Sequence, residues 1–173
     1  MSKQHYDVST YKAQIGVGYL VKRAHSLMLD ILEPVIEQRG FSFIQYVVLT
    51  SLRDGIAVNP KAICVQYRHD SGALTRVIDQ LAERGLLERV RRDRDRRKVE
   101  LQLTPAGRET IESLVPLVVG KLNEVLAGFD GAEFQELLRL LMKLNTTLLT
   151  HVDTNAAADT NAVADPNVVA AEA

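Results

Sequence analysis

Apolar side chains recur at steps of three and four residues along most of this chain, which is the spacing of helices that bury one face. The first such stretch runs from Tyr11 to about Ile36, and Pro34 should kink or end it, because proline removes a backbone donor. A second helix is predicted from Phe43 to about Arg53, with Ser42 as its cap. Asn59 and Pro60 then open a short third helix that ends near Tyr67.

A fourth helix and a hairpin follow in the middle of the chain. Asp70 or Ser71 caps the helix, which ends at Gly85. Two strands are predicted next, over residues 87–91 and 98–103, and the second alternates apolar and polar residues as a half-exposed strand does. The helix carries a narrow apolar stripe, which consists of Leu74, Val77, Ile78 and Leu81.

Two long helices complete the ordered part of the chain. The first begins at Thr104 and Pro105, and the second runs from Ala132 to about His151. Their apolar stripes are too wide for one small core to cover, so we expect the terminal helices to pair with a second subunit. Residues 152–173 consist largely of Ala, Asp, Asn and Thr with a net charge of −4, which predicts a disordered acidic tail.

Positive charge gathers in one ten-residue segment at the tip of the predicted hairpin, from Arg89 to Lys98 (RVRRDRDRRK). This segment has a net charge of +5 in a protein whose total is −1. A basic hairpin tip on a protein that is otherwise acidic indicates a nucleic-acid partner. Together with the two preceding helices it predicts a mainly α fold with a small β-hairpin, a winged helix-turn-helix. Residues 1–151 would form this domain with its N- and C-terminal dimerisation helices, and residues from about 42 to 104 its DNA-binding lobe.

The fourth helix supplies the candidate base contacts, because a helix enters the major groove with its N-terminal residues against the base edges. Gly72 and Ala73 allow close approach of the backbone, while Ser71 and Thr75 supply short hydroxyl groups. Arg76 can reach a phosphate or a guanine. Each residue alone also fits a solvated helix face. The polar helix face is followed along the chain by the basic hairpin, and the two together favour double-stranded DNA as the partner.

Several other classes of protein lack support in the sequence. No secretion signal and no apolar run of about 18 residues is present, so we expect a cytoplasmic protein without membrane contact. Phosphate-binding loops, G-x-S-x-G and H-E-x-x-H are missing, which argues against an enzyme, and no cofactor is expected. The four His are scattered, which argues against a metal site. Cys64 lies in an apolar context that favours a buried thiol over a redox sensor.

The segment from Leu74 to Glu109 resembles the MarR (multiple antibiotic resistance regulator) family of bacterial and archaeal repressors. The resemblance rests on a TR-x-x-D-x-L-x-x-x-GL run and on a D-x-R stretch six residues ahead of LT-x-x-G. The order of the helices extends it to residues 11–151. It implies that the fourth helix reads DNA and that the N- and C-terminal helices join a homodimer.

The resemblance also implies roles for the hairpin tip. Arg97 is the residue implied to enter the minor groove, and Asp95 is implied to brace the hairpin. Arg94 and Arg96 lie beside them in the same basic tip, and we include both among the predicted DNA contacts.

Members of the resembled family often hold a ligand where the first and second helices meet the DNA-binding lobe. Arg23, Ser26 and Tyr46 fall at such positions, and an arginine beside a phenol suits an aromatic carboxylate, although a structural role fits each residue equally well. The predicted function is a ligand-responsive regulator, a repressor that binds a pseudo-palindromic operator as a homodimer until a small aromatic effector releases it. The alternative is a constitutive or protein-controlled winged-helix protein, or an architectural one, without small-molecule sensing.

Overall fold

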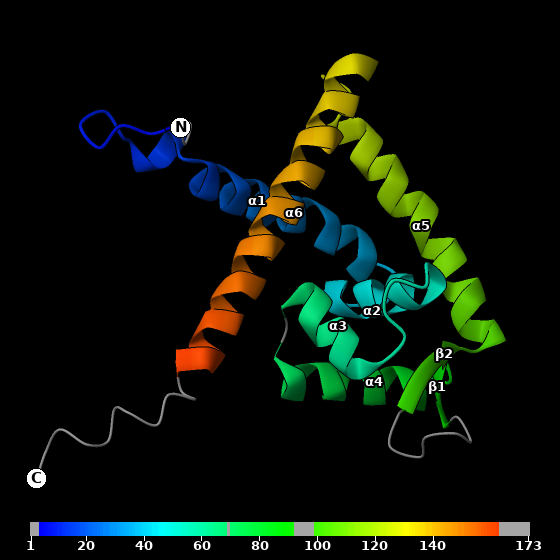
Figure 1. Ribbon diagram of the computed structural model, residues 1–173. Coiled ribbons are helices and arrows are strands. Elements are labelled where there is room, and N and C mark those ends of the chain that lie inside the picture. The colour runs from blue at the N-terminus through cyan, green and yellow to red at the C-terminus, as the bar shows by residue number, and fades with distance from the viewer. Residues whose placement is uncertain (1–3, 69, 92–98, 163–173) are drawn as a thin grey trace, which may run out of the picture. The chain divides into compact units, whose positions relative to one another are not determined.

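Short helices, a hairpin and two long helices follow one another along the computed structural model of this protein (Figure 1). The structure describes residues 4–68, 70–91 and 99–162. The chain divides into two units, residues 1–124 and 125–173. In chain order the described elements are η1 (Ala13–Ile15), α1 (Val17–Glu37), α2 (Phe43–Arg53), α3 (Pro60–Tyr67), α4 (Ser71–Glu83), β1 (Leu87–Arg91), β2 (Val99–Leu103), α5 (Pro105–Val125) and α6 (Gly131–Ala162).

Polar side chains start α2, α3 and α4 at the positions that the sequence predicts. Ser42 Oγ accepts a bond from the Gln45 N–H at 3.3 Å, while Gln45 Oε1 accepts one from the Ser42 N–H at 3.0 Å, so the pair forms a capping box. Asn59 caps α3 and Asp70 caps α4, each by accepting a backbone N–H at 2.9 Å. These caps confirm the predicted starts of the three helices.

Helix α1 begins later than predicted. The expected start at Tyr11 is wrong, because the η1 turn and an extended Gly16 precede the first helical residue, Val17. The hydroxyl of Tyr6 accepts a bond from the Val17 N–H at 2.9 Å, and so supplies the cap that glycine lacks. Pro34 lies inside the helix near its C-terminal end, and α1 continues past it.

The two strands form an antiparallel hairpin in which residues 87–91 pair with residues 99–103. Leu101 is buried in β2 and its neighbour Gln102 is exposed, which confirms the predicted alternation. The loop that joins the strands, residues 92–98, lies outside the described residues, so the predicted strand residue Lys98 is not described either.

The core of the first unit combines α4, the hairpin and the facing sides of α1, α2, α3 and α5. The predicted stripe of α4 lies at its centre, although Val77 is only partly buried. Burial of each such aliphatic side chain stabilises the fold by about 1.5 to 3 kcal/mol relative to exposure. The most deeply buried aliphatic residues are Ile36, Val48, Leu49, Ile63, Leu74, Ile78, Leu81, Leu101, Ile111 and Leu114.

Helix α5 is tied to the end of α4 and to the base of the hairpin. Thr104 Oγ1 donates to the Gly85 carbonyl at 2.6 Å and accepts a bond from the Gly107 N–H at 3.0 Å, so one hydroxyl caps α5 and holds it to the preceding turn. Gly107 then packs directly on the backbone of Leu86. The helix continues through Pro116.

The second unit contains α6. Asp130 and Glu133 cap its start reciprocally: the Asp130 carboxylate accepts the Glu133 N–H, and the Glu133 carboxylate accepts the Asp130 N–H, each at 2.9 Å. The predicted disordered tail from Val152 differs from the structure, in which α6 continues to Ala162. Residues 152–162 contain four alanines and no proline or glycine, so no residue among them breaks the helix. Residues 163–173 lie outside the described residues.

Candidate nucleic-acid interface

Helix α4 carries a polar surface at its N-terminal end, opposite a buried apolar one. Leu74, Ile78 and Leu81 are at most 1% exposed and fix which side of the helix faces the core. The predicted base-contacting residues of this helix are all exposed, and they are Ser71, Gly72, Ala73, Thr75 and Arg76. The structure therefore brings these five residues together at the end of α4 that would lead into a major groove.

Local hydrogen bonds determine what this surface can offer to a base. Thr75 Oγ1 donates to the Ser71 carbonyl at 2.7 Å, so the Thr75 hydroxyl is left as an acceptor. An exocyclic amine of adenine or cytosine in the major groove is a donor that fits it. A Cβ on Gly72 would lie 3.2 Å from Asp70 Oδ1, so glycine keeps the first turn of the helix uncrowded.

Two side chains, Gln45 and Arg84, hold α4 against α2 and the turn before it. Gln45, which is 9% exposed, donates through Nε2 to Gln80 Oε1 at 3.2 Å and joins α2 to α4. Arg84, at the C-terminal end of α4, donates to the Gly40 carbonyl at 3.0 Å. The same guanidinium lies 3.9 Å from the centroid of the Phe41 ring, a cation–π contact. The start of α2 and the turn before it therefore fix the position of α4.

An ion pair joins α4 to the hairpin. Arg89 of β1 donates to the Asp79 carboxylate of α4 at 2.6 Å, with both side chains partly exposed. Such a pair contributes little to stability in water. It can still orient β1, and with it the start of the hairpin tip, relative to α4.

A buried polar pair fixes α3 against α2. Ser51 is 0% exposed, and its Oγ donates to the Val47 carbonyl at 2.8 Å. The hydroxyl of Tyr67, the last residue of α3, lies 2.8 Å from Ser51 Oγ and donates to it, since the serine proton is used on Val47. Sequence reasoning missed this pair, because residues 16 positions apart on two helices give no pattern.

The predicted contacts of the hairpin tip lie outside the described residues. They are Arg94, Asp95, Arg96 and Arg97. The paired strands on either side show only that the loop leaves and re-enters the sheet at residues 91 and 99. Their role in DNA binding stays a prediction.

The residues predicted to hold an effector are not joined by a direct contact within the part of the chain that the structure describes. Arg23 and Ser26 are exposed on α1, where the Arg23 guanidinium donates to the Tyr19 hydroxyl at 3.2 Å. Tyr46 lies on α2, half-buried beside the Phe43 ring at a centroid distance of 6.2 Å. Helices α1 and α2 do pack on each other. The two sides of the predicted site therefore come from neighbouring elements.

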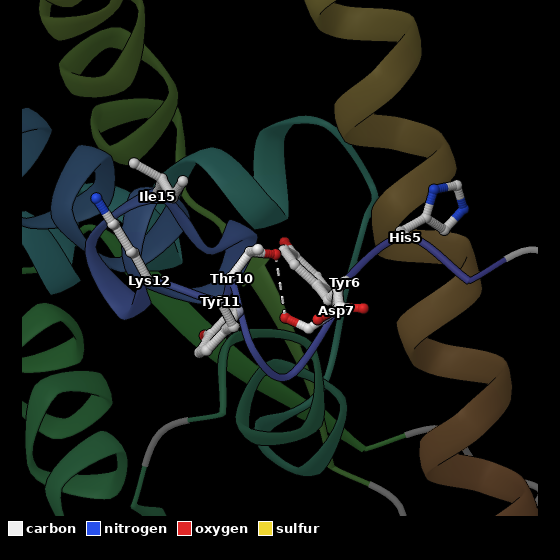
Figure 2. A pocket seen from close by; sticks show the side chains of 7 residues that line it. All are labelled: His5, Tyr6, Asp7, Thr10, Tyr11, Lys12 and Ile15. Atoms are coloured by element: carbon white, nitrogen blue, oxygen red, sulfur yellow. Dashed lines mark hydrogen bonds between the residues drawn. The ribbon is translucent and has the colours of Figure 1, made fainter.

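A cavity of about 230 Å³ lies elsewhere, in the segment before α1 (Figure 2). The rings of Tyr6 and Tyr11 meet edge to face with centroids 5.2 Å apart. The Asp7 carboxylate accepts the hydroxyl and N–H of Ser9, and these bonds lower the pKa of Asp7 below its ordinary value. Sequence reasoning missed this cavity, whose lining residues are His5, Tyr6, Asp7, Thr10, Tyr11, Lys12 and Ile15.

Other kinds of site find no structural support in the described ranges. Residues 4–68, 70–91 and 99–162 contain no group of three or more His, Cys, Asp or Glu placed to hold a metal ion. None of the described helices is long and apolar enough to cross a membrane. Cys64 is a half-buried free thiol packed against the core.

Comparison with known proteins gives one consistent family. Residues 42–99 match the model of the MarR family. BpsR of Bordetella bronchiseptica, whose DNA binding is regulated by 6-hydroxynicotinic acid, is 31% identical, and the match covers 78% of this chain and 96% of BpsR with a TM-score of 0.68.

Two further matches involve the multiple antibiotic resistance protein MarR of Escherichia coli. Its sequence is 28% identical over 129 residues, which cover 75% of this chain and 90% of MarR. A mutant of MarR in complex with operator DNA is similar at 26% identity and a TM-score of 0.66, covering 78% of this chain and 99% of that one. The predicted family and the winged-helix fold are thereby confirmed.

Proposed function

This chain belongs to the MarR family of DNA-binding transcriptional regulators, and we propose that it is a ligand-responsive repressor that binds a pseudo-palindromic operator as a homodimer. Members of this family regulate transcription, which confirms the prediction that the chain is not an enzyme. A repressor of this kind acts in the cytoplasm, where the DNA lies.

The exposed polar end of α4 is the observation that carries the proposal. Ser71, Thr75 and Arg76 offer two hydroxyl groups and a guanidinium within two turns of one helix. We assign base recognition to this surface, and phosphate and minor-groove contacts to the arginines of the hairpin tip, because base edges give specificity and phosphates give position. MarR of Escherichia coli in complex with operator DNA supports DNA as the partner.

Apolar surface on both units supports a homodimer. In the first unit, Val17, Leu20 and Leu27 of α1 are 46%, 50% and 49% exposed. In the second, Leu148 and Leu149 of α6 are 52% and 55% exposed. Each unit by itself exposes these apolar side chains, so we infer that two copies associate through their terminal helices and cover them.

We propose an aromatic carboxylate as the effector and place it between Arg23, Ser26 and Tyr46. Regulation of BpsR by 6-hydroxynicotinic acid, itself an aromatic carboxylate, supports the chemical class. Arg23 supplies the cation and Tyr46 an aromatic surface on the neighbouring helix. Such a ligand lowers DNA affinity only to the extent that it prefers the conformation of the protein that does not bind DNA. A coupling free energy of about 1 to 3 kcal/mol between the two sites is typical.

Selection of duplexes from a random pool by the full chain tests the operator and the dimer together. The enriched sequences should contain two inverted half-sites about 10 bp apart, centre to centre, because two copies of α4 related by a two-fold axis reach the groove one turn apart. Enrichment of single, unrepeated half-sites would contradict the homodimer. No enrichment at all would favour the alternative, an architectural protein without sequence preference.

The effector is tested with 6-hydroxynicotinic acid as the first probe, followed by a panel of benzoates. Binding should release the selected duplex from the wild-type protein. Arg23→Ala should abolish this response and leave duplex affinity unchanged in the absence of the acid. If no acid of the panel releases DNA or raises Tm, the constitutive or protein-controlled regulator becomes the better account.

A further inference from the structure

Arg68 has an unusual backbone conformation at the point where α3 ends and α4 is about to begin. Its φ of 53° and ψ of 36° lie in the left-handed helical region. It is the only residue other than glycine with a positive φ among residues 4–68, 70–91 and 99–162. Positions 40 and 85 also have a positive φ, but both are glycines, which adopt this conformation without steric cost.

This conformation is a helix C-cap, a role in which glycine is the usual residue. The Arg68 N–H donates to the Cys64 carbonyl and so closes the last turn of α3. Glycine would make the same backbone bond without the steric cost that a Cβ brings in this region. The backbone hydrogen bond therefore does not explain why a long cationic side chain stands here, and backbone strain of this kind gathers at functional sites.

The surroundings of Arg68 hold its backbone while its side chain stays exposed. On one side, Tyr67 is anchored through its hydroxyl to the buried Ser51. On the other, Asp70 caps α4 only two residues later. Within the described residues, the Arg68 guanidinium is exposed and has no hydrogen-bond or ion-pair partner. The guanidinium is therefore open to a partner from outside the chain, at a position two residues before the cap of α4.

We propose that Arg68 binds a DNA phosphate at the edge of the major groove that α4 enters, and that the left-handed backbone aims its guanidinium there. A helix that enters this groove with its N-terminus has a sugar–phosphate backbone beside its first turn. A guanidinium at that place forms charge-assisted hydrogen bonds to phosphate oxygens. The inference rests on the proposed role of α4 in DNA binding.

The competing explanation is that Arg68 only stabilises α3. A cation near the C-terminal end of a helix interacts favourably with its unpaired carbonyl groups. That effect would act on folding and leave DNA binding untouched. Stability and DNA affinity, measured on the same variants, therefore separate the two explanations.

Three substitutions of Arg68 and one matched control provide the test. Arg68→Gly removes both the charge and the strain, Arg68→Ala removes only the charge, and Arg68→Lys keeps both. The control, Arg39→Ala, removes another exposed arginine. Its neighbour Gly40 contacts the C-terminal end of α4, and that end lies about 20 Å from the start of the helix. Affinity for a fluorescent random-sequence duplex would be followed by anisotropy at about 50 mM and about 200 mM salt.

The phosphate contact predicts a specific dependence on salt. Each lost contact lowers the slope of log K against log salt by about 0.9, so the affinity ratio of wild type to Arg68→Ala should be about threefold to fourfold larger at the lower salt for each contact. Arg68→Gly should show the same loss and melt about 2 to 4 °C higher than Arg68→Ala. Arg68→Lys and Arg39→Ala should bind nearly as the wild type does.

Two results would overturn the proposal. If Arg68→Ala and Arg68→Gly keep the wild-type salt slope, Arg68 does not contact phosphate. If Arg68→Gly melts below Arg68→Ala, the left-handed conformation is not strained. A failure of the proposed role of α4 would give a different result. Arg76→Ala would then leave the preference for selected over random duplexes unchanged. Loss of the phosphate contact of Arg68, in contrast, should weaken binding to both duplexes by the same factor.

Discussion

Substitution of Gly107 by alanine tests the packing that supports the hairpin. A Cβ built on Gly107 would lie 1.8 Å from the Leu86 carbonyl oxygen and 2.8 Å from its carbonyl carbon. Both obstacles are backbone atoms, so no rotamer change relieves the clash. Either α5 or the chain at Leu86 must move by more than about 1 Å, a displacement that a close-packed interior resists.

The expected cost follows from the contacts that this movement disturbs. Overpacking costs about 1 to 3 kcal/mol, and the bonds from Thr104 to the carbonyls of Gly85 and Leu86 contribute about 1 kcal/mol each. Gly107→Ala should therefore lower the free energy of unfolding by about 3 to 5 kcal/mol. At about 2 to 4 °C per kcal/mol for a chain of this length, Tm should fall by about 10 °C.

The same substitution elsewhere in α5 provides the control. Gly120 is exposed, and apart from the adjacent backbone of α5 no atom of the described residues lies within 4 Å of a Cβ built on it, so Gly120→Ala should gain about 1 kcal/mol from helix propensity alone. Thermal unfolding followed by circular dichroism measures both variants. A Gly107→Ala protein that melts within about 2 °C of the wild type would show that α5 does not approach Leu86 this closely.

Three further predictions concern the packing of α3 on α2, the ion pair between α4 and β1, and the dimer. Tyr67→Phe should lower the free energy of unfolding by about 1 kcal/mol in chemical denaturation, because only the bond between the two hydroxyls is lost and Ser51 keeps its bond to the Val47 carbonyl. A larger loss would mean that this bond stabilises more of the fold than the packing of α3 on α2. Asp79→Asn should change stability by less than about 1 kcal/mol, since its ion pair is partly exposed, and a clear fall in Tm would contradict this assignment. Leu148→Glu should shift sedimentation toward monomer with little effect on folding, whereas an unchanged dimer would exclude this part of α6 from the interface.

The short helices were predictable because their boundaries are encoded locally. Ser42, Asn59 and Asp70 cap the helices that follow them, and Gly85 takes a φ of +69° where α4 is predicted to end. Each of these signals acts within a few residues of the chain. The exposed face of α4 followed for the same reason, since its narrow apolar stripe fixes which residues point outward.

Other features depended on contacts between distant parts of the chain or on a misread composition. The start of α1 depends on the Tyr6 hydroxyl eleven residues before Val17, which no periodicity reveals. The close approach of Gly107 to Leu86 likewise needs the folded structure. The end of α6 was missed for a different reason, because a segment without an apolar stripe was taken as disordered although its alanines favour a helix.

Sequence-specific DNA binding through α4 is the central claim, and one affinity ratio tests it most directly. Anisotropy titrations would compare a selected operator duplex with a random duplex at physiological salt, for the wild-type chain and for Arg76→Ala. The wild type should prefer the operator by at least about 10³-fold, and Arg76→Ala should lose about 10- to 100-fold of that preference while retaining most of its affinity for the random duplex. Equal affinity of the wild type for both duplexes, or an unchanged preference in Arg76→Ala, would contradict the assignment of base recognition to α4.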